Sequence, residues 1–154
     1  MKLKWVTLAI AALTIFGIAG ITVAGSKTSP FNVDKKGVVL HGYDAVSYFD
    51  DPAPVKGSDA ISYNYMGATW KFSTAENRKK FAQSRMKYMP QYGGYCAKAV
   101  SENKLVDVDP LAYKIVDGKL YLNYDMSVQK IWEKDMDERI AKANQNWPVL
   151  MRGE

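Results

Sequence analysis

Residues 61–72, with the sequence ISYNYMGATWKF, decide the fold class of this 154-residue chain. Apolar side chains occupy every second position from Ile61 to Tyr65, and again at Trp70 and Phe72. An alternation with a period of two is typical of a half-buried strand, and a glycine between two such runs favours a tight turn. The stretch therefore predicts a β-hairpin with one aromatic face, whose rings we expect in the core rather than in a ligand site.

A helix is expected directly after this hairpin. Ser73 and Glu76 have the spacing of a capping box, in which each side chain satisfies a free backbone N–H group at the start of a helix. The sequence therefore predicts a helix that begins at Ser73 and runs through Phe81 towards Arg85.

The second half of the chain repeats this order. Apolar residues alternate on both sides of Asp117-Gly118, a dipeptide favoured in two-residue hairpin turns because both positions tolerate positive φ. Asp125 is then placed to cap one long helix, in which apolar residues recur at three- and four-residue spacing until Pro148 ends it. We therefore predict an α+β fold, with a small antiparallel sheet built from two hairpin-helix units.

The N-terminal segment has the charge pattern of a chain that enters a membrane. Lys2 and Lys4 precede an uncharged stretch that ends at Gly25. Residues 1–25 are therefore predicted to be a signal peptide or a membrane anchor helix: the spanning length favours an anchor, and small residues around Ala24 favour cleavage. Both alternatives place the domain on the outer side of the cytoplasmic membrane, in the periplasm or outside the cell.

The remaining chain has the size and composition of one globular domain. Residues 26–35 are predicted to be a linker and residues 36–150 a single domain. The net charge of +5 is spread along the chain and no nucleic-acid-binding motif is found. This pattern favours solubility or contact with an anionic lipid surface over nucleic-acid binding. The expected partners are the membrane, through the N-terminal segment, and a membrane protein complex.

Cys96 is the main candidate for chemistry because it is the only cysteine and follows Gly93-Gly94. Two adjacent glycines allow backbone angles closed to other residues, so the loop can aim the next side chain. A short helix that starts at Ala97 would place the thiol at a helix N-terminus, where a thiolate is favoured. The alternative is a buried cysteine that packs as a small apolar residue.

Five stretches together resemble the exported branch of the YHS-domain family, over residues 36 to 148. These stretches are HGYDAVSYF (41–49), WKFS (70–73), PQYGGYCA (90–97), VDP (108–110) and NWP (146–148). The resemblance implies a compact α+β domain, and some relatives carry selenocysteine where this chain has Cys96. It therefore implies a nucleophile, a redox centre or a soft-metal ligand at Cys96, and the wider family is associated with heavy-metal handling. The name-giving triplet stands here as Tyr95-Cys96-Ala97, and the additional cysteines of metal-binding relatives are absent.

A copper(I) site is predicted from the soft and borderline ligands of the chain. Cys96 with His41, the only histidine, and a methionine such as Met89 would suit copper(I), and Met66 and Met86 also offer thioethers. One cysteine and one histidine are too few for a structural zinc site. The alternatives are a histidine that hydrogen-bonds to the backbone and methionines that fill the core.

Three functions follow from these residues. The first is an exported binding domain that handles a soft metal, copper(I), through Cys96. The second is an accessory subunit tethered to a membrane complex. The third is a thiol-based redox protein in which Cys96 is the catalytic residue. If His41 meets Cys96 in space, the two would be a thiolate and its base, or two ligands of a soft metal. The chain has no established catalytic motif, so enzymatic activity is left open and no substrate is predicted.

Overall fold

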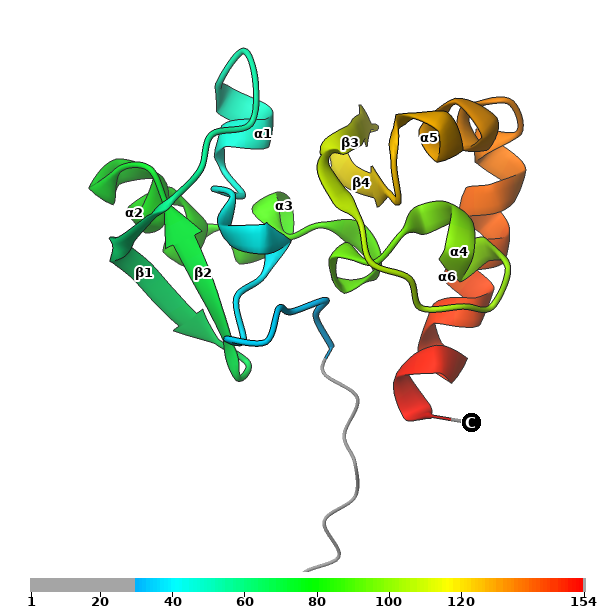
Figure 1. The fold of residues 1–154 in the computed structure, drawn as a ribbon, viewed down its shortest axis with the longest axis horizontal. Helices are drawn as coiled ribbons and strands as arrows, with labels where there is room; N and C mark the ends of the chain where they lie inside the picture. Colours follow the sequence, from blue (N-terminus) through cyan, green and yellow to red (C-terminus); the bar gives the residue numbers. More distant parts are fainter. Residues whose placement is uncertain (1–29, 154) are drawn as a thin grey trace, which may run out of the picture.

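The computed structural model describes residues 30–153, and it confirms the α+β class (Figure 1). The elements in chain order are η1 (Leu40–Gly42), α1 (Ser47–Asp50), β1 (Ser58–Tyr65), β2 (Ala68–Phe72), α2 (Ala75–Gln83), α3 (Arg85–Tyr88), η2 (Gln91–Gly94), α4 (Ala97–Ser101), β3 (Asp109–Val116), β4 (Lys119–Asn123), α5 (Met126–Glu133) and α6 (Met136–Arg152). The predicted signal or anchor helix at residues 1–25 lies outside the described residues. No helix within residues 30–153 has both the length and the apolar character needed to cross a membrane.

The four strands form two separate antiparallel sheets of two strands each, where one sheet was expected. Each hairpin packs against its own helices, with α2 on the first hairpin and α5 on the second. Figure 1 shows the two hairpins in opposite halves of the molecule. The two sheets share one apolar cluster, in which Trp70 and Phe72 of β2 lie with Leu120 and Leu122 of β4.

The two hairpin-helix units are repeats of one structure. Each hairpin joins an eight-residue strand to a five-residue strand, and each is followed by a helix whose N-cap side chain accepts a hydrogen bond from the residue three positions later. Each unit also begins with three successive residues of positive φ. These residues are Leu40, His41 and Gly42, with φ of 56°, 51° and 84°, and Tyr92, Gly93 and Gly94, with φ of 54°, 60° and 85°.

The repeat makes Asp44 and Cys96 equivalent positions. Each lies two residues after its positive-φ triplet, and each is almost completely buried. The N–H of Asp44 donates to the carbonyl of Val55 at 2.8 Å, and the N–H of Cys96 donates to the carbonyl of Val106 at 2.9 Å. The backbone turn at Cys96 thus repeats the backbone turn at Asp44. The turn of the first unit carries a carboxylate, and the turn of the second unit carries a thiol.

The predicted N-terminal cap of the helix after the first hairpin is wrong. Thr74, not Ser73, caps α2, since its hydroxyl oxygen accepts from the N–H of Asn77 at 3.0 Å. Ser73 instead donates its hydroxyl proton to the buried Asp44 carboxylate at 2.7 Å. A buried carboxylate is a stronger acceptor than the backbone groups of a capping box, so it takes this hydroxyl.

The predicted long C-terminal helix is divided in two, and Pro148 does not end it. Asp125 caps α5 as expected, with its carboxylate 2.8 Å from the N–H of Val128. The chain then leaves the helical conformation at Asp135 (φ −135°, ψ 38°) before α6 begins. Pro148 lies inside α6, which continues to Arg152. The periodic pattern of apolar residues runs on across this break and does not reveal it.

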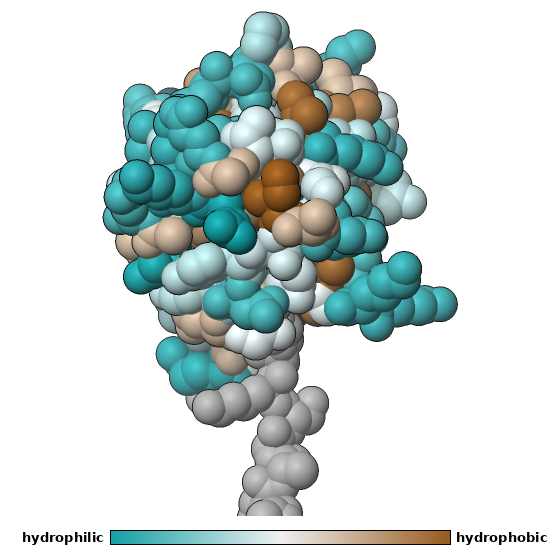
Figure 2. All heavy atoms as spheres, turned by 90° about the vertical axis from the view of Figure 1, so that its left-hand side faces the viewer, coloured by the Kyte–Doolittle hydropathy of each residue, from teal (hydrophilic) through white to brown (hydrophobic). Residues whose placement is uncertain are grey.

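Aromatic side chains fill the core of both units, as expected. In the first unit Trp70 and Phe72 each pack against Phe81, with ring centroids 4.7 and 5.2 Å apart. In the second, Tyr121 and Trp132 pack at 5.5 Å. Figure 2 shows the face over the first unit, where hydrophilic side chains surround a few apolar ones. These five rings are therefore buried packing residues.

Tyr48 connects the two units and predicts a loss of stability at alkaline pH. Its hydroxyl donates to the carbonyl of Pro110 at 2.9 Å, and its ring packs edge-on against Tyr113. Burial raises the pKa of Tyr48, and also that of Tyr92, above the ordinary value of a phenol. The folded state therefore favours the neutral phenols, and this contribution is complete below about pH 10 and is lost as the pH rises further.

We expect the free energy of unfolding to fall above about pH 10 by about 1.4 kcal/mol per pH unit for each phenol that ionises only in the unfolded chain. Tyr48→Phe should start from a lower stability but lose less of it between neutral and alkaline pH. Urea unfolding at a series of pH values measures both slopes. Equal slopes for the two proteins would contradict the assignment to Tyr48.

Candidate functional site

Cys96 lies in the core and not at the surface. α4 begins at Ala97, as expected, but the Cys96 side chain is 1% exposed and packs with the main apolar cluster. Its Sγ is 3.8 Å from Oδ1 of Asn123. The described residues therefore leave the thiol no open path from solvent.

The polar neighbour of the sulfur is a hydrogen-bond acceptor. Oδ1 of Asn123 also accepts from the backbone N–H of Lys98 at 3.3 Å, and this fixes the amide with its oxygen towards Cys96. An acceptor suits the S–H group of a thiol, whereas a thiolate needs a donor. The Nδ2 of Asn123 is buried and has no hydrogen-bond partner among residues 30–153.

The first unit shows what this position does in the fold. The equivalent residue, Asp44, accepts hydrogen bonds from the N–H of Val46, from the N–H and hydroxyl of Ser73, and from Nδ2 of Asn77, all within 2.9 Å. In the second unit the amide of Asn123 receives the N–H of Lys98, which corresponds to Val46. In both units this buried position joins the turn to the end of the second strand.

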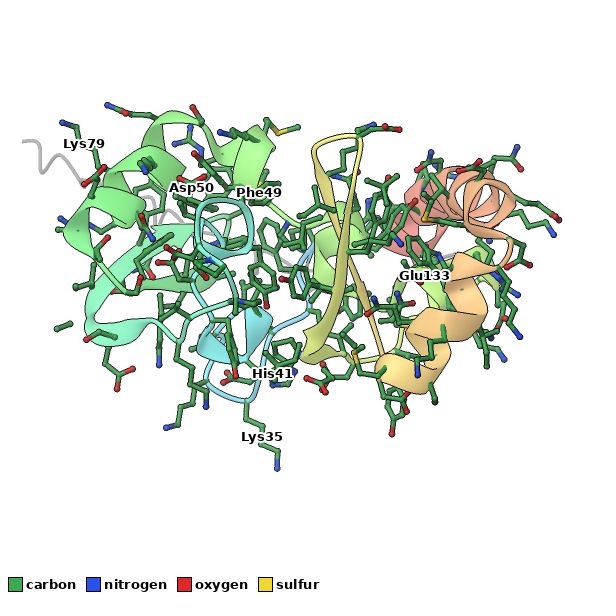
Figure 3. All side chains as sticks on the ribbon, turned by 90° about the horizontal axis from the view of Figure 1, so that it is seen from above. Lys35, His41, Phe49, Asp50, Lys79 and Glu133 are labelled. Atoms are coloured by element: carbon green, nitrogen blue, oxygen red, sulfur yellow. The ribbon has the colours of Figure 1, made fainter. Side chains whose placement is uncertain are left out.

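His41 pairs with a carboxylate. Its Nε2 lies 2.8 Å from Oδ1 of Asp107, which also accepts from Nδ2 of Asn32 and from the N–H of Val108, each at 2.8 Å. Partial burial raises the pKa of Asp107, but the hydrogen bonds from Asn32, His41 and Val108 outweigh it and hold this pKa below its usual value. Figure 3 shows His41 near the line where the two units meet. The pair ties the first unit to the segment that leads into β3.

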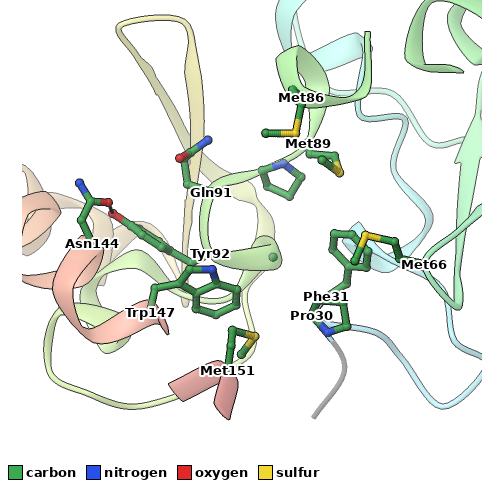
Figure 4. Close-up of a pocket in the computed structure, with 12 residues that line it drawn as sticks. Pro30, Phe31, Met66, Met86, Met89, Gln91, Tyr92, Asn144, Trp147 and Met151 are labelled. Atoms are coloured by element: carbon green, nitrogen blue, oxygen red, sulfur yellow. Dashed lines mark hydrogen bonds between the residues drawn. The ribbon is translucent and has the colours of Figure 1, made fainter. Parts of the chain in front are cut away.

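Met89, the third predicted ligand, lines a pocket of about 340 Å³ between the two units (Figure 4). Three more methionines line the same pocket: Met66 from the turn between β1 and β2, Met86 from α3, and Met151 from α6. We call these four residues and the space between them the methionine pocket. The structure thus brings Met89 together with Met66 and Met86, and it places Cys96 and His41 in two other environments.

The methionine pocket offers soft ligand atoms and carries no charge. Among residues 30–153, none of the twelve that line it is charged. Its rings come from Phe31, Tyr92 and Trp147, and its only side-chain amides are Gln91 and Asn144. Asn144 is already engaged, because its Oδ1 accepts from the hydroxyl of Tyr92 at 2.9 Å. The donor atoms still available on the walls are therefore mainly thioether sulfurs.

Met66 occupies a backbone conformation that methionine disfavours. Its φ is 49°, and the equivalent turn residue of the second unit, Asp117, has a φ of 50°. Aspartate, asparagine and glycine are the usual residues at this place in a tight hairpin, whereas a long side chain is strained there. Met66 is nevertheless held at the rim of the pocket with 59% of its surface exposed. Strain of this kind concentrates at functional sites.

Sequence reasoning named three of the four pocket methionines but did not group them, and it missed Met151. One signal was present: Met66-Gly67 stands where the second hairpin has Asp117-Gly118. Within residues 30–153, no cluster of three or more histidine, cysteine, aspartate or glutamate side chains is placed to hold a metal ion.

Comparisons with protein-family models, with curated proteins and with solved structures found no match for this chain. The resemblance to the YHS-domain family remains a prediction from the motifs.

Proposed function

We propose that this protein is an exported binding domain for a soft metal ion, copper(I), and that the methionine pocket holds the ion. The observation that carries the proposal is the gathering of four of the seven methionines around one uncharged cavity. Met66, Met86 and Met89 are the proposed ligands, and Met151 and Trp147 form the opposite wall. Cys96 is a structural residue in this proposal.

The donor set supports copper(I) over other metals. Thioethers are soft ligands and select copper(I), whereas carboxylates and imidazoles, which the pocket lacks, suit harder and borderline ions. Methionine side chains have three rotatable bonds, so a sulfur can change direction without movement of the backbone. A thioether has no proton to lose on binding, so its affinity for the ion should change little with pH.

The position of Met66 gives independent support. A core-filling role does not explain a methionine that is largely exposed and strained in a turn. A role as a ligand does, because the turn places this side chain at the rim of the pocket that Met86 and Met89 also line.

Silver(I), which has the same preference for soft ligands but does not change oxidation state, is the probe for the test. We expect about one silver(I) ion to bind per chain. Replacement of Met66, Met86 or Met89 by leucine should each weaken binding at least about tenfold, equivalent to about 1.4 kcal/mol, and the triple variant at least about a hundredfold. Titration calorimetry or competition with a chelator measures these affinities.

Two matched controls accompany this test. Met126→Leu removes an exposed methionine outside the pocket, and Cys96→Ser removes the thiol; both should leave the affinity unchanged. A triple variant that binds silver(I) like the unaltered protein, or a Cys96→Ser variant that does not bind it, would overturn the proposal.

Met66→Asn separates binding from folding. Asparagine tolerates positive φ, so this variant should unfold at a higher urea concentration while it binds silver(I) more weakly. A purely structural role of Met66 predicts the gain in stability without the loss of affinity.

The accessory and thiol-redox roles remain predictions. The redox role requires a reagent to reach a thiol that is 1% exposed. The accessory role rests on the N-terminal segment, which lies outside the described residues.

A further inference from the structure

We propose that Met86 and Met66 are sites of reversible sulfoxidation by hydroperoxides, and that this modification releases the soft metal ion. The inference rests on the proposed function, because the affected property is metal binding in the methionine pocket. It adds a covalent modification and the class of its oxidant.

The two residues differ from the other pocket methionines in their exposure. Met86 is 82% exposed and Met66 is 59% exposed. Met89 is only partly exposed and packs against the main core cluster. A dissolved oxidant therefore reaches two of the three proposed ligands first. Met126, which is 50% exposed and lies outside the pocket, provides an internal reference for an accessible methionine.

The reaction is a two-electron oxygen transfer. The thioether sulfur attacks one oxygen of hydrogen peroxide, an S–O bond forms, and the O–O bond breaks. The other oxygen leaves as hydroxide and takes up the proton of the transferred oxygen, so the products are a sulfoxide and one water molecule. Sulfur is oxidised and peroxide is reduced, and no residue of this chain needs to supply a proton or an electron.

Sulfoxidation changes the character of the ligand. The sulfur becomes polar and its lone pair a poorer donor, while the new oxygen is a hard donor that copper(I) disfavours. The loss of two of the three proposed thioethers leaves Met89, which alone cannot complete a soft coordination shell. Bound metal should in turn protect Met86 and Met66, since their lone pairs are then engaged.

Reversal requires an external reductant. A dithiol of a methionine sulfoxide reductase takes the oxygen away as water and becomes a disulfide. The chain has one cysteine, and it is buried, so the protein cannot supply this dithiol itself.

The test treats the full-length chain with hydrogen peroxide, with and without silver(I), and locates the sulfoxides by peptide mass spectrometry. Without silver(I), Met86, Met66 and Met126 should oxidise before the other described methionines. With one equivalent of silver(I), Met86 and Met66 should be protected at least about tenfold, while Met126 oxidises at its former rate. The oxidised protein should bind silver(I) at least about tenfold more weakly and recover after treatment with the reductase and a dithiol.

The outcomes separate the two proposals. If the reduced protein does not bind silver(I), the proposed function fails. If the reduced protein binds silver(I) but the oxidised protein binds it equally well, or if silver(I) protects Met126 as much as Met86, the sulfoxidation inference fails while the metal site stands. A Met126→Leu variant that loses affinity on oxidation to the same extent as the unaltered protein would support the pocket as the place of the effect.

Discussion

Replacing Asp44 by alanine is expected to lower the free energy of unfolding by about 3–5 kcal/mol. The Asp44 side chain is fully buried, and its two oxygens accept four hydrogen bonds that join the turn before α1 to Ser73 and to Asn77 of α2. Alanine would leave these four donors without their acceptor. Urea unfolding followed by tryptophan fluorescence measures the loss.

Asp44→Asn is the matched variant, because its single carbonyl oxygen can still face the donors of Ser73 and Asn77. We expect it to cost about 1–3 kcal/mol, less than alanine. If alanine and asparagine destabilise the domain equally, the hydrogen-bonded network does not make the contribution assigned to it.

Gly93→Ala is the second large effect, with an expected loss of about 2–5 kcal/mol. A Cβ atom at this position would lie 2.0 Å from the carbonyl oxygen of Pro30, and the φ of 60° disfavours any residue with a side chain. The segment at Pro30 is also held by the N–H of Asn32, which donates to the carbonyl of Gly93 at 2.9 Å. The clash therefore falls on a fixed part of the backbone and on one wall of the methionine pocket.

Gly118→Ala isolates the conformational part of this cost. Gly118 has a φ of 70°, but no atom of residues 30–153, apart from Gly118 and its two chain neighbours, lies within 4 Å of the position of an added Cβ. We expect it to cost about 1–2 kcal/mol. Urea unfolding measures both losses. If Gly93→Ala and Gly118→Ala lower the free energy of unfolding equally, the contact of the added Cβ with Pro30 does not destabilise the fold.

The hairpins could be predicted because local chemistry determines them. Alternating aromatic residues and the Asp117-Gly118 turn identify strands without any information from distant residues. The cap of α2 was misplaced because Ser73 is used by Asp44, which is distant in the sequence. The number of sheets could not be predicted from local sequence patterns either, because it depends on which helix packs against which hairpin.

The environment of Cys96 shows a second limit of sequence reasoning. The double glycine and the short helix after it were predicted, and the structure contains both. Whether a side chain at the start of a helix faces solvent or core depends on the packing around it. Here β4 and Asn123 lie on the same side as the sulfur, so the thiol is covered.

The methionine pocket could not be grouped from the sequence because its walls come from four separate segments. Residues near Pro30, the first hairpin turn, the segment from Met86 to Gly93, and α6 meet only in the folded chain. The repeat itself offered the best indication, since comparison of the two hairpin turns shows methionine where aspartate would be less strained.

The most direct test of the account is an NMR titration of the full-length chain labelled with ¹³C in the methionine methyl groups. On addition of silver(I), the methyl signals of Met66, Met86 and Met89 should shift and saturate at about one equivalent, while the signal of Met126 stays in place. If the pocket signals do not move while silver(I) binds, or if Cys96→Ser abolishes the shifts, the methionine pocket is not the metal site.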